Sequence, residues 1–363
     1  MRESILTDND DILFGAEGAV GTVLLNRPHA LNAFTLGMYR RFAPQLRAWA
    51  ADPHVRAVLV EGAGDRAFCA GGDVRAVYEA GKGISGDPDF TRLFFAEEYR
   101  IILGIHRYPK PYAAILDGIT MGGGAGVSVN GAYRVATEKT MFAMPETGIG
   151  LFPDVGATRF LNLCPGRIGR YLGLTGARLG PADALYCGFA THFVPRDRVP
   201  ELKAALAGLA WEGGKERAQV DAVLARFAAD PGPPPLSARR AMIDRCFGHD
   251  RVEAILDALQ AETEDPAWAQ ETHASLLTKS PTSLRITLRQ LVLGQGMELE
   301  DALKLEYRLT QHVMAAHDFY EGVRAVLVDK DQKPQWRPPT LAAVDGAATE
   351  RYFATLGDGE LTF

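Results

Sequence analysis

Short apolar runs alternate with longer amphipathic segments over the first 145 residues of the chain. The short runs are rich in β-branched residues and end at glycine, proline or charged residues, which is typical of strands. We expect strands at residues 21–25, 55–61, 112–116, 133–136 and 140–143. Between the first two runs, Met38, Phe42, Leu46 and Trp49 recur at helical spacing and predict one buried helix face. Strands separated by helices indicate an α/β core.

The pattern changes after about residue 200, where strand signals fade and helical periodicity dominates. The proline-rich run 231–235 interrupts this part, and we expect a loop there because no helix continues through such a run. Helices are expected at residues 251–262 and 299–316. At roughly 150 residues per domain, the chain suits about two domains. We expect an α/β core over residues 1–200 and a helical C-terminal lobe over residues 201–363.

Composition and charge exclude several classes of protein. The chain has 39 basic and 45 acidic residues and no lysine-rich block, so we expect no nucleic-acid partner. The most apolar long stretch, residues 112–129, contains Asp117 and five glycines, so we expect no membrane span. The first eleven residues resemble neither a signal peptide nor a transit peptide, and the four cysteines form no CxxC pair. We therefore expect a cytoplasmic protein without a metal site.

Two glycine clusters each follow an apolar run and precede a segment that can form a helix. They are Gly71-Gly72 and residues 122–126. Glycine permits close approach of a ligand to the backbone, and the first amides of a helix lack internal partners, so such turns can bind an oxyanion. The clusters can also be a plain turn or a close helix contact. Neither cluster fits the dinucleotide fingerprint or the phosphate loop.

Two carboxylates, Glu146 and Asp154, lie eight residues apart in a segment that is otherwise apolar and is punctuated by glycine and proline. Apolar surroundings raise the pKa of a carboxyl group and allow it to act as base, acid or nucleophile. The alternative is structural: Glu146 caps a helix and Asp154 forms an Asx-turn. Both interpretations remain open from this segment alone.

Taken in order, these segments resemble the crotonase (enoyl-CoA hydratase/isomerase) superfamily, as does the opening LNRPHALNA at residues 25–33. The resemblance implies a spiral of ββα units in which the amides of Gly72 and Gly123 form an oxyanion hole for an acyl-CoA thioester. Further matches resemble the 3-hydroxyisobutyryl-CoA hydrolase branch, and the resemblance spans about residues 15–345. These further matches are residues 145–156, 175–179, 188–194, 280–284 and 319–331.

The resemblance to the hydrolase branch also implies roles for individual residues. Hydratases of the superfamily carry two glutamates, and the first of these positions is Gly126 here, whereas the second is retained as Glu146. In the hydrolase branch, Glu146 and Asp154 would serve thioester hydrolysis, and Glu98, from an acidic pair before a tyrosine, would contact the substrate.

The expected function is therefore hydrolysis of a short 3-hydroxyacyl-CoA, with 3-hydroxyisobutyryl-CoA of valine breakdown as the expected substrate. The alternative is an enoyl-CoA hydratase or isomerase, which residues 157–159 (ATR) resemble more closely. A third possibility is a non-catalytic acyl-CoA-binding protein. No cofactor is implied, because CoA is part of the substrate, and we expect a homo-oligomer.

Overall fold

The computed structural model describes residues 10–84, 87 and 89–363, and its internal contacts divide the chain into two units. The first unit comprises the chain up to residue 72 together with residues 100–142 and 179–232. The second comprises residues 73–99, 143–178 and 233–363. The units interleave along the chain, because two segments from the N-terminal half pack with the C-terminal helices. This division differs from the single boundary expected near residue 200.

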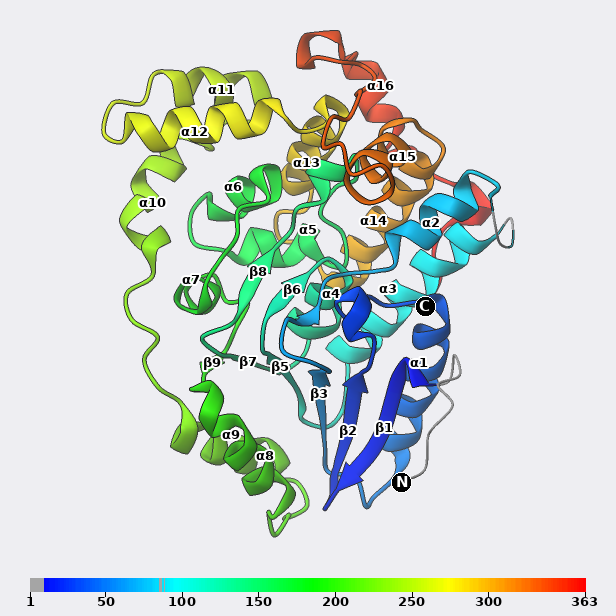
Figure 1. The fold of residues 1–363 in the computed structure, drawn as a ribbon, viewed down its shortest axis with the longest axis vertical. Coiled ribbons are helices and arrows are strands. Elements are labelled where there is room, and N and C mark those ends of the chain that lie inside the picture. The colour runs from blue at the N-terminus through cyan, green and yellow to red at the C-terminus, as the bar shows by residue number, and fades with distance from the viewer. Residues whose placement is uncertain (1–9, 85–86, 88) are drawn as a thin grey trace. The chain divides into compact units, whose positions relative to one another are not determined.

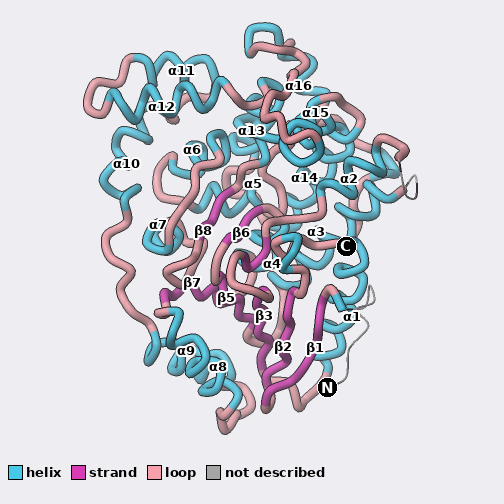
Figure 2. The backbone as a smooth tube through the Cα atoms, in the orientation of Figure 1, coloured by secondary structure: helices cyan, strands magenta, loops and turns pink. Residues whose placement is uncertain are grey.

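The first unit holds two sheets (Figures 1 and 2). The larger has the strand order β1-β2-β3-β5-β7-β9, and the smaller has the order β4-β6-β8. The strands are β1 Ile12–Glu17, β2 Val20–Leu25, β3 Ala57–Gly62, β4 Ala67–Cys69, β5 Tyr112–Leu116, β6 Ile119–Met121, β7 Tyr133–Ala136, β8 Met141–Ala143 and β9 His192–Phe193.

From β3 onward, consecutive strands alternate between the two sheets. Strand β3 lies in the larger sheet and β4 in the smaller, and the pairs β5–β6 and β7–β8 repeat this arrangement. In the larger sheet β1 and β2 are antiparallel, and the other neighbouring strands run parallel. The repeated passage from one sheet to the other, with helices between the pairs, confirms the expected α/β class.

All five strands expected from the sequence are present as β2, β3, β5, β7 and β8, with ends within two residues of those expected. Helix α1, Leu36–Ala51, buries Met38, Phe42, Leu46 and Trp49, as the spacing predicts. It begins at Thr35, whose hydroxyl accepts a hydrogen bond from the Met38 amide at 3.1 Å. The buried face of α1 packs beside β1 (Figure 1).

Four further helices complete the first unit, and a fifth, α3, is shared with the second. They are α4 Gly123–Val129, α7 Pro181–Tyr186, α8 Val199–Ala207, α9 Glu216–Phe227 and the shared α3 Phe90–His106. Apolar side chains of α8 and α9, such as Leu202, Val223 and Phe227, form one core with Leu59 and Val135 of the larger sheet. Burial of these apolar side chains stabilises the packing of α8 and α9 on the larger sheet.

The second unit is helical. Its other helices are α2 Val74–Gly81, α5 Ala157–Phe160, α6 Ile168–Thr175, α10 Pro235–Cys246, α11 Val252–Gln260, α12 Pro266–Leu277, α13 Pro281–Leu293, α14 Leu299–Met314, α15 Asp318–Val323 and α16 Gly346–Arg351. The expected helices at 251–262 and 299–316 are α11 and α14, and the proline-rich run lies in the loop before α10. Residues 201–363 contain helices and no assigned strand, but residues 201–232 group with the first unit, so the expected lobe over 201–363 stays a prediction.

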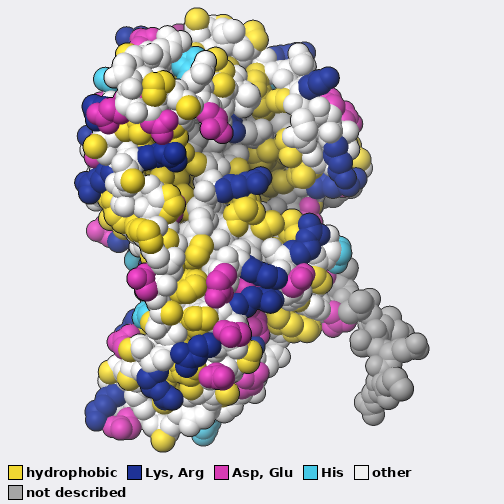
Figure 3. Space-filling view, turned by 60° about the vertical axis from the view of Figure 1, so that its left-hand side comes forward, with side chains coloured by type: hydrophobic (Ala, Val, Ile, Leu, Met, Phe, Trp, Pro, Cys, Tyr) yellow, Lys and Arg dark blue, Asp and Glu magenta, His cyan; other side chains and the backbone are white. Residues whose placement is uncertain are grey.

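The visible surface carries charges of both signs. In Figure 3, lysine and arginine side chains are interspersed with aspartate and glutamate. Ion pairs of the chain include Arg56 with Glu216 and Lys203 with Glu61. Among the residues that the structure describes, no helix combines the length and apolarity needed to cross a bilayer.

Close packing of β4 against α4 generates a stability prediction. A Cβ atom added at Gly124 would collide with the carbonyl oxygen of Cys69 at the end of β4. Backbone would have to move, so we expect Gly124→Ala to lower the free energy of unfolding by about 1–3 kcal/mol. The control is Gly104→Ala in α3, where nothing lies within 4 Å of the added carbon. Chemical denaturation measures both variants, and wild-type stability of Gly124→Ala would contradict the packing described.

Candidate functional site

The two glycine clusters meet at one edge of the smaller sheet. Strands β4 and β6 are parallel neighbours, so the turns after them lie at the same edge. A Cβ atom built on Gly71 would lie 3.6 Å from the Met121 carbonyl oxygen and 3.8 Å from the Gly123 amide nitrogen. The chain segments that carry Gly72 and Gly123 therefore lie side by side in the first unit.

The backbone of these turns requires glycine. Gly71 has a φ of 124° and Gly122 a φ of 48°, values that residues with a side chain rarely adopt. Gly123 is the first residue of α4, so its amide has no acceptor within that helix. The alternative interpretation of the second cluster, a close helix contact, applies to Gly124, which packs against Cys69. This contact does not involve the Gly123 amide, which lies at the start of α4.

The second unit gathers four buried carboxyl groups. Glu98 comes from α3, Glu146 begins the short 3-10 helix η3 (Glu146–Ile149), Asp154 follows in the next loop, and Glu306 lies on α14. Their exposed fractions are 2%, 5%, 4% and 0%. The structure therefore brings together the three acidic residues that the sequence indicates, Glu98, Glu146 and Asp154, and adds Glu306.

The environment of Glu146 favours its neutral form. Burial raises the pKa of Glu146 well above its usual range, and the charges of Asp154 and Glu98 raise it further. Its Oε2 atom has no hydrogen-bond partner among the described residues. Lys279 lies beside the same turn, with its Nζ atom 3.7 Å from the position of a Cβ on Gly148, and burial lowers the pKa of Lys279. A buried oxygen without a partner is costly unless a ligand or water satisfies it.

Asp154 is held by a tyrosine. The Tyr99 hydroxyl donates a hydrogen bond of 2.7 Å to Oδ2 of Asp154. Burial raises the pKa of Asp154 to about 6, and the bond from Tyr99 opposes that rise. Burial and the charges of Asp154, Glu306 and Glu98 raise the pKa of Tyr99 well above its usual range. Tyr99 therefore remains a proton donor to Asp154 at neutral pH.

Tyr99 and Glu306 are the members of this group that sequence reasoning missed. Tyr99 directly follows Glu98, and nothing in the sequence links it to Asp154, which lies 55 residues away. Glu306 does carry a signal, because it lies on the same stripe of α14 as the buried residues Leu303, Thr310 and Val313. A charged residue on such a stripe indicates a buried polar partner.

Helix α15 packs directly on the turn that carries Glu146. A Cβ atom at Gly322 would collide with the backbone of Ile149, and one at Gly150 would collide with the backbone of Asp318. The Asp318 carboxylate accepts hydrogen bonds from the Ser280 hydroxyl at 2.6 Å and from the Arg337 amide at 2.8 Å. Segment 319–331, which the family resemblance singles out, thus packs on the backbone beside Glu146.

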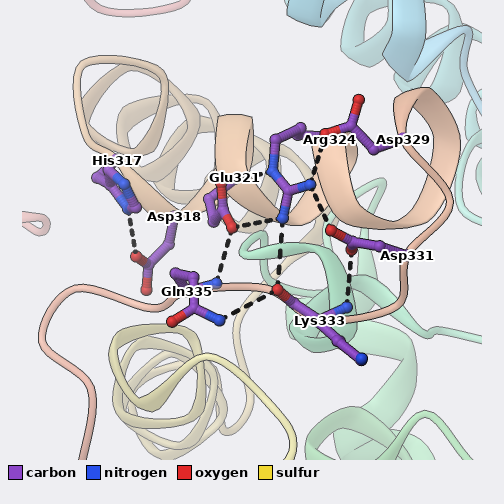
Figure 4. A network of polar contacts seen from close by, with 8 residues as sticks. All are labelled: His317, Asp318, Glu321, Arg324, Asp329, Asp331, Lys333 and Gln335. Carbon is purple, nitrogen blue, oxygen red and sulfur yellow. Dashed lines mark hydrogen bonds and ion pairs between the residues drawn. The ribbon is translucent and has the colours of Figure 1, made fainter.

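A network around Arg324 fixes the chain that follows α15 (Figure 4). The Arg324 guanidinium group, directly after the last residue of α15, pairs with Glu321 on α15 and with Asp329 and Asp331 further along the chain. Glu321 also accepts the Gln335 amide at 2.8 Å. These bonds hold the loop against α15, which in turn contacts the Glu146 turn.

Within the described part of the chain, no group of three or more His, Cys, Asp or Glu residues is placed to hold a metal ion.

Comparison with known proteins identifies the family. Residues 20–353 match the family described as enoyl-CoA hydratase/isomerase, and the chain belongs to that family. It is 46% identical over 353 residues to the mitochondrial 3-hydroxyisobutyryl-CoA hydrolase of Danio rerio, covering 97% of this chain and 91% of that protein. The identity to the Homo sapiens protein of the same name is 42% over 369 residues, covering 100% and 94% of the two chains.

Two solved structures share the whole fold. A carnitinyl-CoA dehydratase from Mycobacterium thermoresistibile is 45% identical, with a TM-score of 0.89, and covers 98% of this chain and 99% of its own. An enoyl-CoA hydratase from Rhodobacter sphaeroides 2.4.1 is 39% identical, with a TM-score of 0.87, and covers 97% and 100%. The crotonase-like fold and the family resemblance are therefore confirmed.

The expected cytoplasmic location is wrong, because the curated relatives are named as mitochondrial proteins. One reason for the expectation was the cysteine pattern. The cysteines Cys69, Cys164, Cys187 and Cys246 are all free and buried. Free thiols indicate only reducing surroundings, and these do not identify the compartment.

The hydrogen bond from Tyr99 generates a titration prediction. Because that bond lowers the pKa of Asp154, we expect Tyr99→Phe to raise this pKa above about 6. Asp154 then keeps its proton to a higher pH. Titration of ¹³C-labelled aspartate by NMR measures the change. The control is Tyr78→Phe, which also removes a tyrosine hydroxyl, but from a ring that contacts Tyr320. An unchanged or lower pKa of Asp154 in Tyr99→Phe would contradict the assignment.

Proposed function

We propose that this chain hydrolyses a short 3-hydroxyacyl-CoA thioester, namely 3-hydroxyisobutyryl-CoA of valine breakdown, to 3-hydroxyisobutyrate and CoA. The observation that carries this proposal is the buried group of Glu98, Glu146 and Asp154 with its unpartnered Glu146 Oε2 atom. Hydrolysis of a thioester needs a base or nucleophile, and the burial that raises the pKa of Glu146 makes its ionised carboxylate a stronger base. Relatives named as 3-hydroxyisobutyryl-CoA hydrolases, at 42–46% identity over nearly the whole chain, support the choice of substrate.

The glycine turns supply backbone donors in this proposal. The amides of Gly72 and Gly123 donate hydrogen bonds to the thioester carbonyl oxygen and stabilise the negative charge that develops on it. Preorganised donors of this kind contribute about 3 kcal/mol each to transition-state stabilisation. The proximity of the two turns and the position of Gly123 at the start of α4 support this role.

Glu146 begins the reaction by one of two routes. As a nucleophile, its carboxylate attacks the carbonyl carbon, the C–S bond breaks, and CoA leaves as the thiolate; water then cleaves the resulting anhydride. As a base, Glu146 takes a proton from water, which attacks the same carbon. Asp154 holds the substrate hydroxyl or the hydrolytic water, and Glu98 orients the acyl group. Different pKa values suit the two carboxyl groups to different roles.

The second candidate is an enoyl-CoA hydratase or isomerase. Two observations favour it: the two solved relatives are named as a carnitinyl-CoA dehydratase and an enoyl-CoA hydratase, and the segment Ala157–Arg159 resembles the hydratases. Against the hydratase, the position of its first glutamate is Gly126, a buried residue of α4 that offers no carboxylate. A protein that only binds acyl-CoA has no need of several buried carboxyl groups, which cost stability.

We also propose a homo-oligomer, with the helical C-terminal lobe expected over residues 201–363 as the surface that joins the subunits. The proposed chemistry uses no cofactor beyond the CoA carried by the substrate. Acyl-CoA recognition itself is common to the family to which the chain belongs.

A panel of thioesters tests the proposed function. Purified protein is given 3-hydroxyisobutyryl-CoA, 3-hydroxypropionyl-CoA, isobutyryl-CoA and crotonyl-CoA, and free CoA is followed with a thiol reagent. We expect rapid release only from the two 3-hydroxy thioesters, because isobutyryl-CoA lacks the hydroxyl group that Asp154 would hold. Loss of crotonyl absorbance without free thiol would identify a hydratase, and no reaction in any assay would identify a binding protein.

A further inference from the structure

The turn that follows Asp154 is strained. Val155 has a φ of 56° and Gly156 a φ of 94°, both in the left-handed region. Valine is β-branched, and its side chain makes this conformation unfavourable. A conformation of this kind persists only where the surrounding structure imposes it. Because Asp154 directly precedes Val155, the turn constrains the position of the backbone from which the Asp154 carboxylate extends to Tyr99.

Two buried side chains from the C-terminal helices hold this turn. The Glu306 carboxylate on α14 accepts the Gly156 amide at 2.7 Å with one oxygen and the Thr158 amide at 2.8 Å with the other. Gln290 on α13 donates through Nε2 to the Pro153 carbonyl oxygen and to the Thr158 hydroxyl, both at 2.7 Å. Each of these four bonds joins residues at least 132 positions apart in the sequence.

The chemistry of Glu306 is unusual for a residue that only fills space. It is fully buried, and burial raises its pKa to about 8, so a carboxyl group here is costly. An apolar side chain would avoid that cost but would leave the amides of Gly156 and Thr158 without acceptors. Position 306 therefore favours a side chain with two acceptor oxygens, one for each amide. Gln290 supplies the donors for the Pro153 carbonyl oxygen and the Thr158 hydroxyl.

We propose that Glu306 and Gln290 are positioning residues for Asp154. Together they impose the left-handed turn at Val155 and Gly156 and thereby keep the Asp154 carboxylate in place beside the Tyr99 hydroxyl. This inference rests on the proposed function, in which Asp154 holds the substrate hydroxyl or the hydrolytic water.

The first test is the kinetics of two variants. Glu306→Gln replaces one carboxylate oxygen by an NH₂ group, which cannot accept a hydrogen bond from the Gly156 or Thr158 amide. Gln290→Met removes the two N–H donors of Gln290 at nearly constant side-chain volume. We expect each to lower kcat for 3-hydroxyisobutyryl-CoA by about 10- to 100-fold, because a small displacement of a reacting group has effects of that size. The matched control is Glu300→Gln on α14, since Glu300 pairs with Lys304. Wild-type kcat in both test variants would overturn the proposal.

A double-mutant cycle separates positioning from general destabilisation. If Glu306 acts through Asp154, Glu306→Gln lowers single-turnover CoA release in the wild-type background and has little effect when Asp154→Asn is already present. Equal factors in both backgrounds would overturn the proposal. Wild-type turnover of Asp154→Asn alone would instead refute the role of Asp154 in the proposed function.

A measurement independent of activity covers the case in which Asp154→Asn releases no measurable CoA. NMR titration of labelled aspartate reads the pKa of Asp154 in Gln290→Met, a substitution that changes no charge. We expect this pKa to shift, because a relaxed turn alters the contact with Tyr99, and we expect no shift in Glu300→Gln. An unchanged pKa of Asp154 in Gln290→Met would overturn the positioning role.

Discussion

The burial of several carboxyl groups away from water is the constraint on which the rest of this structure depends. Glu98, Glu146, Asp154 and Glu306 are each at most 5% exposed. Ionised carboxyl groups without water or partners are strongly unfavourable, and burial raises the pKa values of Glu146, Asp154 and Glu306. Tyr99 donates to Asp154, and backbone amides donate to Glu306. The Glu146 Oε2 atom differs from these groups, because it has no hydrogen-bond partner among the described residues.

Each unit has its own packing requirement. In the first unit, the contact between β4 and α4 needs glycine, because a Cβ atom at Gly124 would collide with Cys69. In the second unit, acidic side chains are buried among helices. This division explains why residues 73–99 and 143–178 group with the C-terminal helices, because α3 and η3 carry the acidic residues that α14 and α15 help to enclose. The long C-terminal part therefore contributes to the candidate site through Glu306, Gln290 and Gly322.

Much of the fold could be predicted from local pattern, because β2, β3, β5 and β7 are runs of four to six apolar or β-branched residues with clear ends. Four strands are missed: β1, β4, β6 and β9. Strands β4, β6 and β9 have only two or three residues, too few to show a period, and β1 has six residues but buries only Ile12, so it shows no apolar pattern. Glu146, Asp154 and the glycine clusters are visible because polar or flexible residues interrupt apolar sequence. The partnerships of Tyr99, Gln290 and Glu306 are not visible, since the bonded residues lie 55 to 150 positions apart. The interleaving of the two units depends on the same distant contacts.

The most direct test of this account is the effect of Glu146→Gln on CoA release from 3-hydroxyisobutyryl-CoA. Glutamine keeps the size of the side chain but can neither attack the thioester nor accept a proton from water. We expect turnover to fall by at least about 100-fold, while calorimetry shows unchanged binding of CoA. The control is Glu79→Gln on α2, because Glu79 pairs with Arg75 at the surface. Wild-type turnover in Glu146→Gln would contradict the central claim that this buried carboxyl group carries the reaction.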